Sequence, residues 1–167
     1  MLHIEKTRKK EMRQAMVESQ IIARGIVNSY VLEAMRAVPR DYFLPDDVSE
    51  YSYEDLPVPI GYGQTISQPY IVALMAELAD LHPTDTVLEV GTGSGYGAAV
   101  IAQIAREVYT IERHQALASH ARHLYEELGY SNIEITHGDG SEGLPEEAPF
   151  DAIVVTAGGP KIPETLK

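Results

Sequence analysis

The feature that most constrains the fold of this chain is a regular alternation of short apolar runs and helical runs in its second half. The apolar runs are rich in β-branched residues, as buried parallel strands are, and span Thr86–Val90, Val108–Glu112, Ile133–Thr136 and Ala152–Thr156. Segments 96–105 and 114–128 repeat apolar residues at helical spacing. Strands that alternate with helices form parallel sheets with right-handed crossovers. We therefore predict an α/β fold, a Rossmann-like doubly wound parallel sheet with strand order 3-2-1-4.

The residues before this core are predicted to form an N-terminal helical extension. Residues 5–24 favour a helix that ends at Gly25 and buries one stripe of side chains, Met12, Met16, Val17 and Ile21. Asn28 has the side chain of a helix N-cap, and the second helix should end at Pro39.

The next segment, 40–63, is rich in proline, glycine and acidic residues, and we predict a loop with at most short strands. Ser67 stands before Gln68-Pro69 and a helical apolar pattern, so we expect Ser67 to cap a third helix. We interpret residues 1–167 as one domain, with N-terminal helices in 1–82 and the βα core in 83–167.

Composition excludes several classes of function. The chain has 167 residues, 44% of them hydrophobic, which suits one globular domain. It has no cysteine, which rules out disulfides, thiolate metal sites and a cysteine nucleophile and fits a cytoplasmic location. The net charge of −12 disfavours nucleic acids and anionic membranes as partners, since both attract cationic surfaces. We expect no membrane-spanning segment, because no apolar run approaches the roughly 18 residues required.

A glycine-rich turn, Gly91-Thr92-Gly93-Ser94-Gly95, follows the first strand of the core. Glycines there permit positive φ and close approach of a ligand, beside the free N–H groups of a helix N-terminus. A dinucleotide fingerprint would place its last glycine at position 96. Tyr96 stands there instead, and we expect its ring to crowd a diphosphate.

The segment Leu88–Tyr96 resembles motif I of S-adenosylmethionine-dependent methyltransferases. The resemblance implies S-adenosyl-L-methionine as the cofactor, with Glu89, Gly91, Thr92 and Gly93 in its site. Glu112 ends the second strand about twenty residues on, where a carboxylate accepts hydrogen bonds from ribose hydroxyls. We place Arg113 beside it in the site, and Asp139-Gly140 at the end of the third strand, facing the adenine.

The most specific resemblance lies in Pro59-Ile60-Gly61-Tyr62-Gly63-Gln64-Thr65-Ile66-Ser67-Gln68-Pro69, which looks like the signature of protein-L-isoaspartate O-methyltransferases. Further pieces agree, among them Val38-Pro39-Arg40 and Pro149-Phe150-Asp151. The resemblance implies methyl transfer to the α-carboxyl group of L-isoaspartyl residues in damaged proteins, whose repair then proceeds through a succinimide. It also implies that Gln64, Thr65, Ile66 and Ser67 line the junction of cofactor and substrate, with Ser67 as the catalytic serine.

The chemistry predicts a modest role for Ser67. The substrate carboxylate is already ionised at neutral pH and needs no general base. We therefore expect Ser67 to orient this carboxylate by a hydrogen bond. The alternative, an ordinary helix N-cap, is compatible with that role.

Several other readings stay open at this level. The same fold serves methyltransferases of small molecules, and a module that binds S-adenosylmethionine without catalysis is a third possibility. His114, His120 and His123 share one helix, where a solvated face is favoured over a metal site, so we assign no metal. Tyr51, Tyr53 and Tyr62 form either a lid over the substrate or local packing.

The resemblance also implies further strands after Ile162-Pro163 in other family members. The chain is then either a fragment of a longer protein or a shortened relative. We expect weak or absent activity from these residues alone, and self-association through the apolar sheet edge at 152–156.

Overall fold

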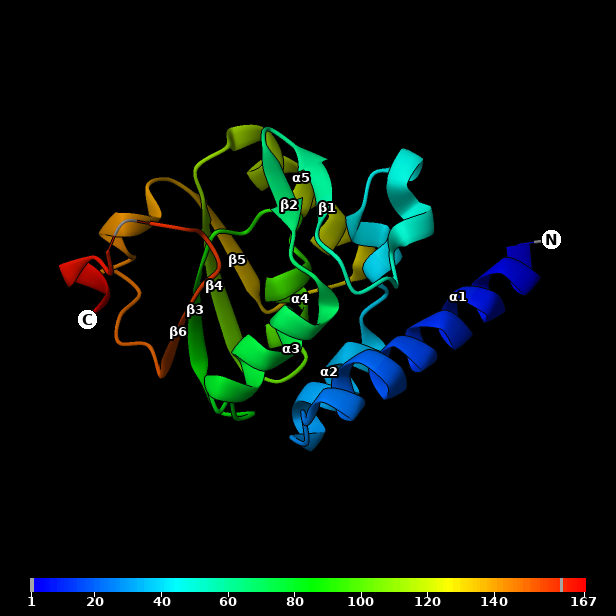
Figure 1. Cartoon of the computed structure of the whole chain (residues 1–167). Coiled ribbons are helices and arrows are strands. Elements are labelled where there is room, and N and C mark those ends of the chain that lie inside the picture. The colour runs from blue at the N-terminus through cyan, green and yellow to red at the C-terminus, as the bar shows by residue number, and fades with distance from the viewer. Residues whose placement is uncertain (1, 160) are drawn as a thin grey trace.

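The computed structural model describes residues 2–159 and 161–167 and is built around one parallel sheet (Figure 1). Its strands are β3 (Thr86–Val90), β4 (Glu107–Glu112), β5 (Ile133–His137) and β6 (Ala152–Val155). They pair in the order β5-β4-β3-β6, and every pairing is parallel. The predicted order 3-2-1-4 is confirmed.

The two faces of this sheet are covered differently. Figure 1 shows α3 (Pro69–Leu78), α4 (Tyr96–Ala102) and α5 (Gln115–Leu128) on one face and the C-terminal segment on the other. Both crossovers from β3 to β5 run in one direction, which places α4 and α5 on the same face. The return to β6 contains only the short 3-10 turn η5 (Gly140–Glu142), and a second turn, η6 (Glu164–Leu166), follows β6. A small cluster closes that face, in which Leu144, Phe150 and Leu166 pack on Leu88, Val90 and Ile111.

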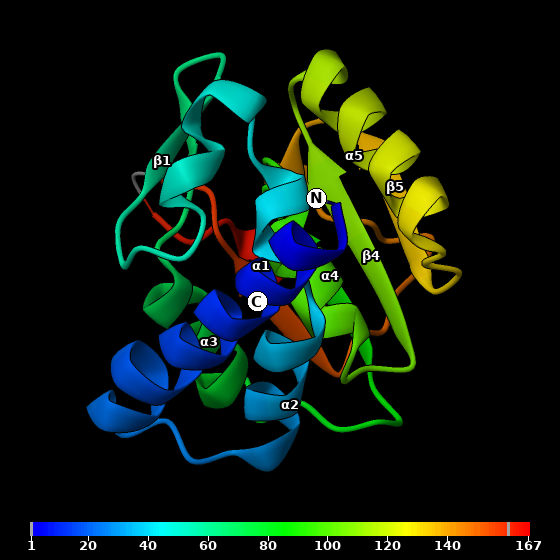
Figure 2. The same cartoon turned by 90° about the vertical axis from the view of Figure 1, so that its right-hand side faces the viewer.

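The N-terminal helix changes type along its length. Helix α1 (Leu2–Met16) continues into a π-helical turn, η1 (Val17–Ile21), and a 3-10 turn, η2 (Ile22–Arg24), and ends at Gly25 with φ of 93°. A π turn is wider than an α turn, so Met16 and Ile21, five positions apart, share one buried face. In Figure 2 α1 and α2 (Ser29–Ala37) lie in front of α4, while α5 runs beside β4 and β5.

The start of α2 agrees with the sequence prediction. The Asn28 side chain accepts hydrogen bonds from the backbone N–H groups of Tyr30 and Val31, at 3.0 and 3.3 Å. The carboxylate of Glu77, on α3, accepts two more, from the N–H groups of Val27 and Asn28, both at 2.8 Å. Local and distant side chains thus both satisfy backbone donors at this terminus.

Segment 40–63 holds more structure than the predicted loop. It contains the 3-10 turns η3 (Arg40–Phe43) and η4 (Asp46–Tyr51), then β1 (Val58–Gly61), which pairs antiparallel with β2 (Gln64–Ile66). The 3-10 turns escaped prediction because one or two turns leave no readable apolar period. The segment also reaches the core, since Arg40 and Phe43 are fully buried.

The expectation that Ser67 caps the third helix is wrong. The N-cap of α3 is Gln68, Pro69 occupies the first turn, and no local side chain bonds the free N–H groups. Asp55 supplies a bond instead, because its carboxylate accepts from the N–H of Tyr70 at 3.3 Å. Asp55 also forms an ion pair with Arg24, with 2.6 Å between the guanidinium nitrogen and the carboxylate oxygen. The guanidinium carbon of Arg24 lies 3.4 Å from the centre of the Tyr70 ring. A long-range contact therefore replaces the cap that the local pattern favoured.

Candidate functional site

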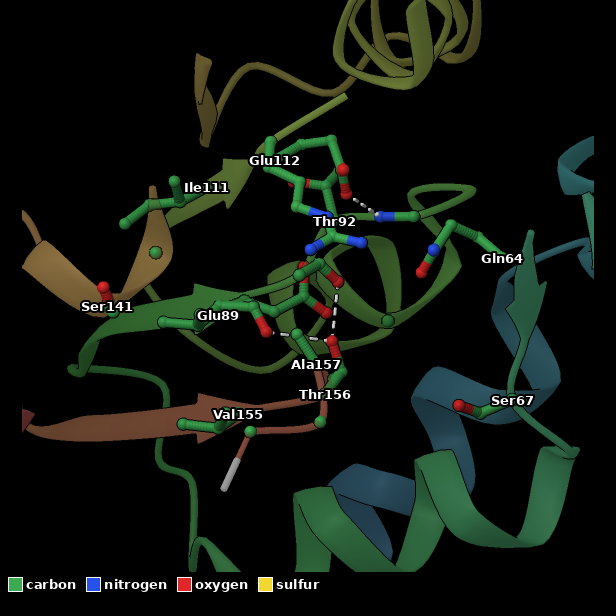
Figure 3. A pocket seen from close by; sticks show the side chains of 18 of the residues that line it. Gln64, Ser67, Glu89, Thr92, Ile111, Glu112, Ser141, Val155, Thr156 and Ala157 are labelled. Carbon is green, nitrogen blue, oxygen red and sulfur yellow. Dashed lines mark hydrogen bonds between the residues drawn. The ribbon is translucent and has the colours of Figure 1, made fainter. Parts of the chain in front are cut away.

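A cavity of about 1250 Å³ opens at the carboxyl ends of the parallel strands, where the strand order reverses. Two sides face each other across it. The glycine turn and the ends of β3 and β4 form one side, and the β1–β2 hairpin forms the other (Figure 3). All the predicted site residues line this cavity: Gln64, Thr65, Ile66, Ser67, Glu89, Gly91, Thr92, Gly93, Glu112, Arg113, Asp139 and Gly140.

The glycine turn is held in shape by the end of β4. The N–H groups of Gly91 and Thr92 both donate to the carbonyl of Ile111, at 2.9 and 3.2 Å. The N–H of Gly93 donates to Oε2 of Glu112 at 2.8 Å. Gly91 and Gly93 have φ of 103° and 55°, in the left-handed region that suits glycine. The bonds from β4 and the two positive-φ glycines therefore fix the shape of the turn.

Glu112 is a buried carboxylate with both oxygens engaged. Oε2 accepts from Gly93, and Oε1 accepts from the N–H of His114, the N-cap of α5, at 2.8 Å. Each carboxylate oxygen can accept a second hydrogen bond. Glu112 is thus held in one orientation where it lines the cavity, with capacity for further hydrogen bonds.

Glu89 is 0% exposed at the floor of the cavity. Its Oε2 accepts from the hydroxyl of Thr110 at 2.7 Å, whereas Oε1 has no partner among the described residues. Burial raises the pKa of Glu89 to about 8; the charge of Glu112 raises this pKa as well, and the bond from Thr110 lowers it. An unpaired acceptor in this position is suited to a cationic or hydrogen-bond-donating ligand.

Asp139 and Gly140 lie at the end of β5, as predicted. The Asp139 carboxylate accepts from the N–H of Ser141 at 2.9 Å, and this bond holds its pKa below the usual value. A Cβ on Gly140 would lie 2.4 Å from Cγ1 of Val90, so glycine is required for this close packing. Arg113 lines the same rim, and its Nε donates to the ring of His114 at 3.3 Å.

Gln64 and Ser67 belong to the hairpin side of the cavity, and Figure 3 shows them across from Glu112 and Thr156. The hairpin turn is made by Tyr62 and Gly63, both with positive φ, 54° and 68°. This geometry matches the right-handed twist of the two strands. Ser67 is half-buried, and with Gln68 as the helix N-cap its hydroxyl is not taken up by α3.

The expectation that the Tyr96 ring would crowd a diphosphate at the glycine turn is wrong. Tyr96 lines the cavity, but its ring is buried in the core. There its centroid lies 5.6 Å from that of the Phe43 ring in a T-shaped contact, and its hydroxyl lies 3.7 Å from the sulfur of Met35. The residue that shapes the cavity here is Gly97, since a Cβ at that position would lie 2.3 Å from Oε1 of Glu89. Successive side chains on a helix point in different directions, so position 97 rather than position 96 faces the Glu89 carboxylate.

The structure also brings in residues that the sequence interpretation missed. Thr110 is fully buried under the turn, Ser141 and Thr156 line the rim, and Thr156 donates to the carbonyl of Gly91 at 2.6 Å. The available signal for Thr110 was its place two residues before Glu112, on the same face of β4.

The three tyrosines proposed as a lid do not converge. Tyr53 is buried and donates a hydrogen bond to Asp41, Tyr51 is exposed, and Tyr62 packs on His114 with ring centres 5.7 Å apart. Local packing is therefore the reading that holds for Tyr53. His120 and His123 lie on the exposed face of α5. Among the residues that the structure describes, no cluster of three or more metal-ligating side chains occurs, and no helix is long and apolar enough to cross a membrane.

The protein family and the relatives that match this sequence carry the same description. The family described as Protein-L-isoaspartate(D-aspartate) O-methyltransferase matches residues 10–167. A protein-L-isoaspartate O-methyltransferase of Synechococcus sp. (strain JA-2-3B'a(2-13)) is 56% identical over 154 residues, which are 92% of this chain and 63% of the relative. Its counterpart in Pelotomaculum thermopropionicum is also 56% identical, over 92% of this chain and 67% of the relative. The chain thus spans about two thirds of the length of these relatives.

Solved structures agree with the sequence relatives. A protein-L-isoaspartate O-methyltransferase superposes with a TM-score of 0.81 at 31% identity, covering 94% of this chain and 50% of the other. A Plasmodium falciparum protein assigned to the same activity was solved in complex with S-adenosyl-L-homocysteine. It gives a TM-score of 0.76 at 28% identity, covering 94% of this chain and 77% of the other. By its motifs, its fold and these relatives, the chain belongs to the protein-L-isoaspartate(D-aspartate) O-methyltransferase family.

Proposed function

We propose that this chain transfers a methyl group from S-adenosyl-L-methionine to the α-carboxyl group of L-isoaspartyl residues in damaged proteins. One observation carries the proposal: the glycine turn with its acids and the hairpin with Ser67 line opposite sides of one cavity. That arrangement provides a cofactor site and an acceptor site at a common junction.

The cofactor supplies an electrophilic methyl group on a sulfonium. The residues suited to hold it are Asp139 for the adenine, Glu112 for the ribose and the turn 91–93 between them. The acceptor carboxylate is ionised at neutral pH, so its oxygen attacks the methyl carbon directly while the carbon–sulfur bond breaks. The protein therefore has to align three atoms and exclude water, since opposite charges cancel in the transfer.

Ser67 fits the role of a positioning donor to that carboxylate. No acid or base is required, so a neutral hydroxyl on the hairpin side is sufficient. The methyl ester that forms is activated toward attack by the neighbouring backbone amide, which closes a succinimide and releases methanol. Hydrolysis of this ring then returns some normal aspartate, so the proposed role is protein repair.

The test is transfer of a radiolabelled methyl group to an isoaspartyl peptide, beside the same peptide with normal aspartate. We expect slow transfer that is confined to the isoaspartyl peptide. It should be slow because Ile153 and Val155, on the β6 wall of the cavity, are 37% and 42% exposed and exclude water poorly. Ser67→Ala should lower the rate further. Equal labelling of both peptides, or cofactor binding without transfer, would contradict the proposal.

We further propose that the chain self-associates through β6. This strand pairs with β3 on one side, lies at the edge of the sheet and exposes two apolar side chains, Ile153 and Val155. Unpaired apolar edges promote association between chains. Sedimentation velocity should show a larger species whose share grows with protein concentration, and Val155→Lys should suppress it. A monomer at every concentration would contradict the proposal.

The cytoplasmic location stays a prediction.

A further inference from the structure

The β1–β2 hairpin separates two cavities. Residues 63–67, which form its β2 side, line the candidate site of about 1250 Å³. Ile60 and Tyr62, on its β1 side, line a second cavity of about 1050 Å³, whose other walls include α1 and α5. Among the described residues the hairpin pairs with no other strand, and two strands alone are only marginally stable. Contacts with neighbouring elements must therefore set the position of the hairpin beside the site.

The tip of the hairpin carries a residue that does not suit its backbone. Tyr62 and Gly63 are the two residues between the strands, and φ is 54° at Tyr62. Asparagine, aspartate and glycine favour such a position, whereas most side chains are strained in this region. Tyr62 is also 61% exposed, so burial does not compensate the strain. Backbone strain of this kind indicates a role that the turn by itself does not require.

The Tyr62 side chain contacts His114. The two ring centres lie 5.7 Å apart, with 32° between the ring planes, a separation that is typical of a stacked pair. His114 is itself held in place at the start of α5, because its N–H donates to Oε1 of Glu112 at 2.8 Å. Its ring also lies 3.3 Å from Nε of Arg113, which donates to it. Tyr62 therefore stacks on a residue that is fixed to the opposite wall of the site.

This stack joins the hairpin to the glycine turn. Glu112, which holds His114, also accepts from the N–H of Gly93 in that turn. Two residues before the tip, Ile60 is buried, and its Cδ1 lies 3.6 Å from the place that a Cβ on Gly93 would take. Strand β1 holds β2 by antiparallel pairing, so these contacts also determine where residues 64–67 lie.

We propose that Tyr62 is a positioning residue: by stacking on His114 it holds the β1–β2 hairpin over the bound cofactor and slows the release of that ligand. The inference rests on the proposed function for the identity of the ligand. In this role Tyr62 acts through residues 64–67 and not by touching the reacting atoms. Loss of its ring leaves the hairpin formed but less firmly held to α5, so the ligand should leave faster.

The test uses a substitution for which this role and a purely structural role predict different results. Tyr62→Asn removes the ring and provides the Asn-Gly pair that a two-residue hairpin turn favours. Tyr62→Phe keeps the ring. Tyr51→Asn is the matched control, because Tyr51 is also exposed but lies in η4. Surface plasmon resonance measures the rate at which S-adenosylhomocysteine dissociates, and urea denaturation without ligand measures the free energy of unfolding.

In Tyr62→Asn we expect the dissociation rate to rise about two- to tenfold, as the loss of an aromatic pair implies. The free energy of unfolding should stay equal or rise, since the turn is relieved of strain. Tyr62→Phe and Tyr51→Asn should both release the ligand at the parent rate. A parent rate in Tyr62→Asn would overturn the inference. So would faster release that is accompanied by a loss of stability without ligand, because that result indicates a general structural role.

His114→Ala tests the pair from its other member. It removes the ring, which makes no cap hydrogen bond to α5, and keeps the N–H that donates to Glu112. We expect a similar rise in the dissociation rate, and no further rise when this change is combined with Tyr62→Asn. Additive effects would overturn the stacking assignment.

The parent chain separates failure of this inference from failure of the proposed function. If the parent binds no S-adenosylhomocysteine, the proposed function and this inference fail together. If the parent binds it and Tyr62→Asn releases it at the same rate, only the role of Tyr62 fails.

Discussion

At the scale of single residues, Glu89 is the site residue whose ionised form has the least favourable surroundings. Its carboxylate is removed from water, has one hydrogen bond and has the charge of Glu112 nearby. Burial raises its pKa from 4.5 to about 8, so the neutral form predominates near neutral pH. Buried ionisable groups that destabilise the folded chain are common at sites where a bound ligand compensates this cost.

This pKa predicts a specific pH dependence. Between pH 4.5 and 8 the folded chain keeps a proton on Glu89 that the unfolded chain releases, so the free energy of unfolding falls as the pH rises across this range. Glu89→Gln removes the contribution. We expect this variant to be more stable than the parent at pH 8.5, by about 1 kcal/mol or more, and similar to it at pH 5.

Urea denaturation at the two pH values measures this difference. Glu134→Gln is the control, because Glu134 lies in the same sheet and is exposed. A Glu89→Gln variant that is equally destabilised at both pH values would show that Glu89 is ionised and favourably paired in the folded chain.

At the scale of elements, the helix termini reveal two ways to satisfy free N–H groups. The start of α2 uses Asn28, a local cap, together with Glu77 from α3. The start of α3 uses Asp55, fifteen residues earlier in the chain. Helix α2 should therefore respond to its own cap more directly than α3 responds to Ser67.

We expect Asn28→Ala to lower the free energy of unfolding by about 1 kcal/mol, since the bonds to Tyr30 and Val31 are lost. Asn28→Asp keeps an acceptor at the cap and should have little effect. Both values come from chemical denaturation followed by circular dichroism. A loss of equal size in both variants would mean that the amide group has a different role.

At the scale of the whole molecule, the cavity connects the hairpin to the sheet, so a ligand that fills it should stabilise the entire fold. With S-adenosylhomocysteine at 100 times its dissociation constant, the gain is about 2.7 kcal/mol. For a domain of this size, that corresponds to a rise in Tm of about 5–10 °C. Differential scanning calorimetry measures the shift. A Tm that stays constant as this ligand is added, while a nicotinamide dinucleotide raises it, would favour another cofactor class.

Much of the architecture follows from patterns along the chain. Strand order, the glycine turn, the acid that ends β4 and the acid that follows β5 were predictable. Buried parallel strands appear in the sequence as apolar runs, and their carboxyl ends meet at one edge of the sheet. Asn28 was predictable as well, since its cap acts on the residues immediately after it. These features depend on neighbours in sequence or on a general topological rule.

Other features depend on contacts that no local pattern contains. The turns at 40–51 are held by burial of Arg40 and Phe43, Asp55 takes the capping role expected of Ser67, and Tyr96 turns into the core. Thr110 meets Glu89 only through the register of two strands, which pairs residues 21 positions apart. The sequence by itself determined the order of elements and the chemical types at the site. The tertiary structure decided which side chains meet, because burial and hydrogen bonding across distant segments outweigh local propensity.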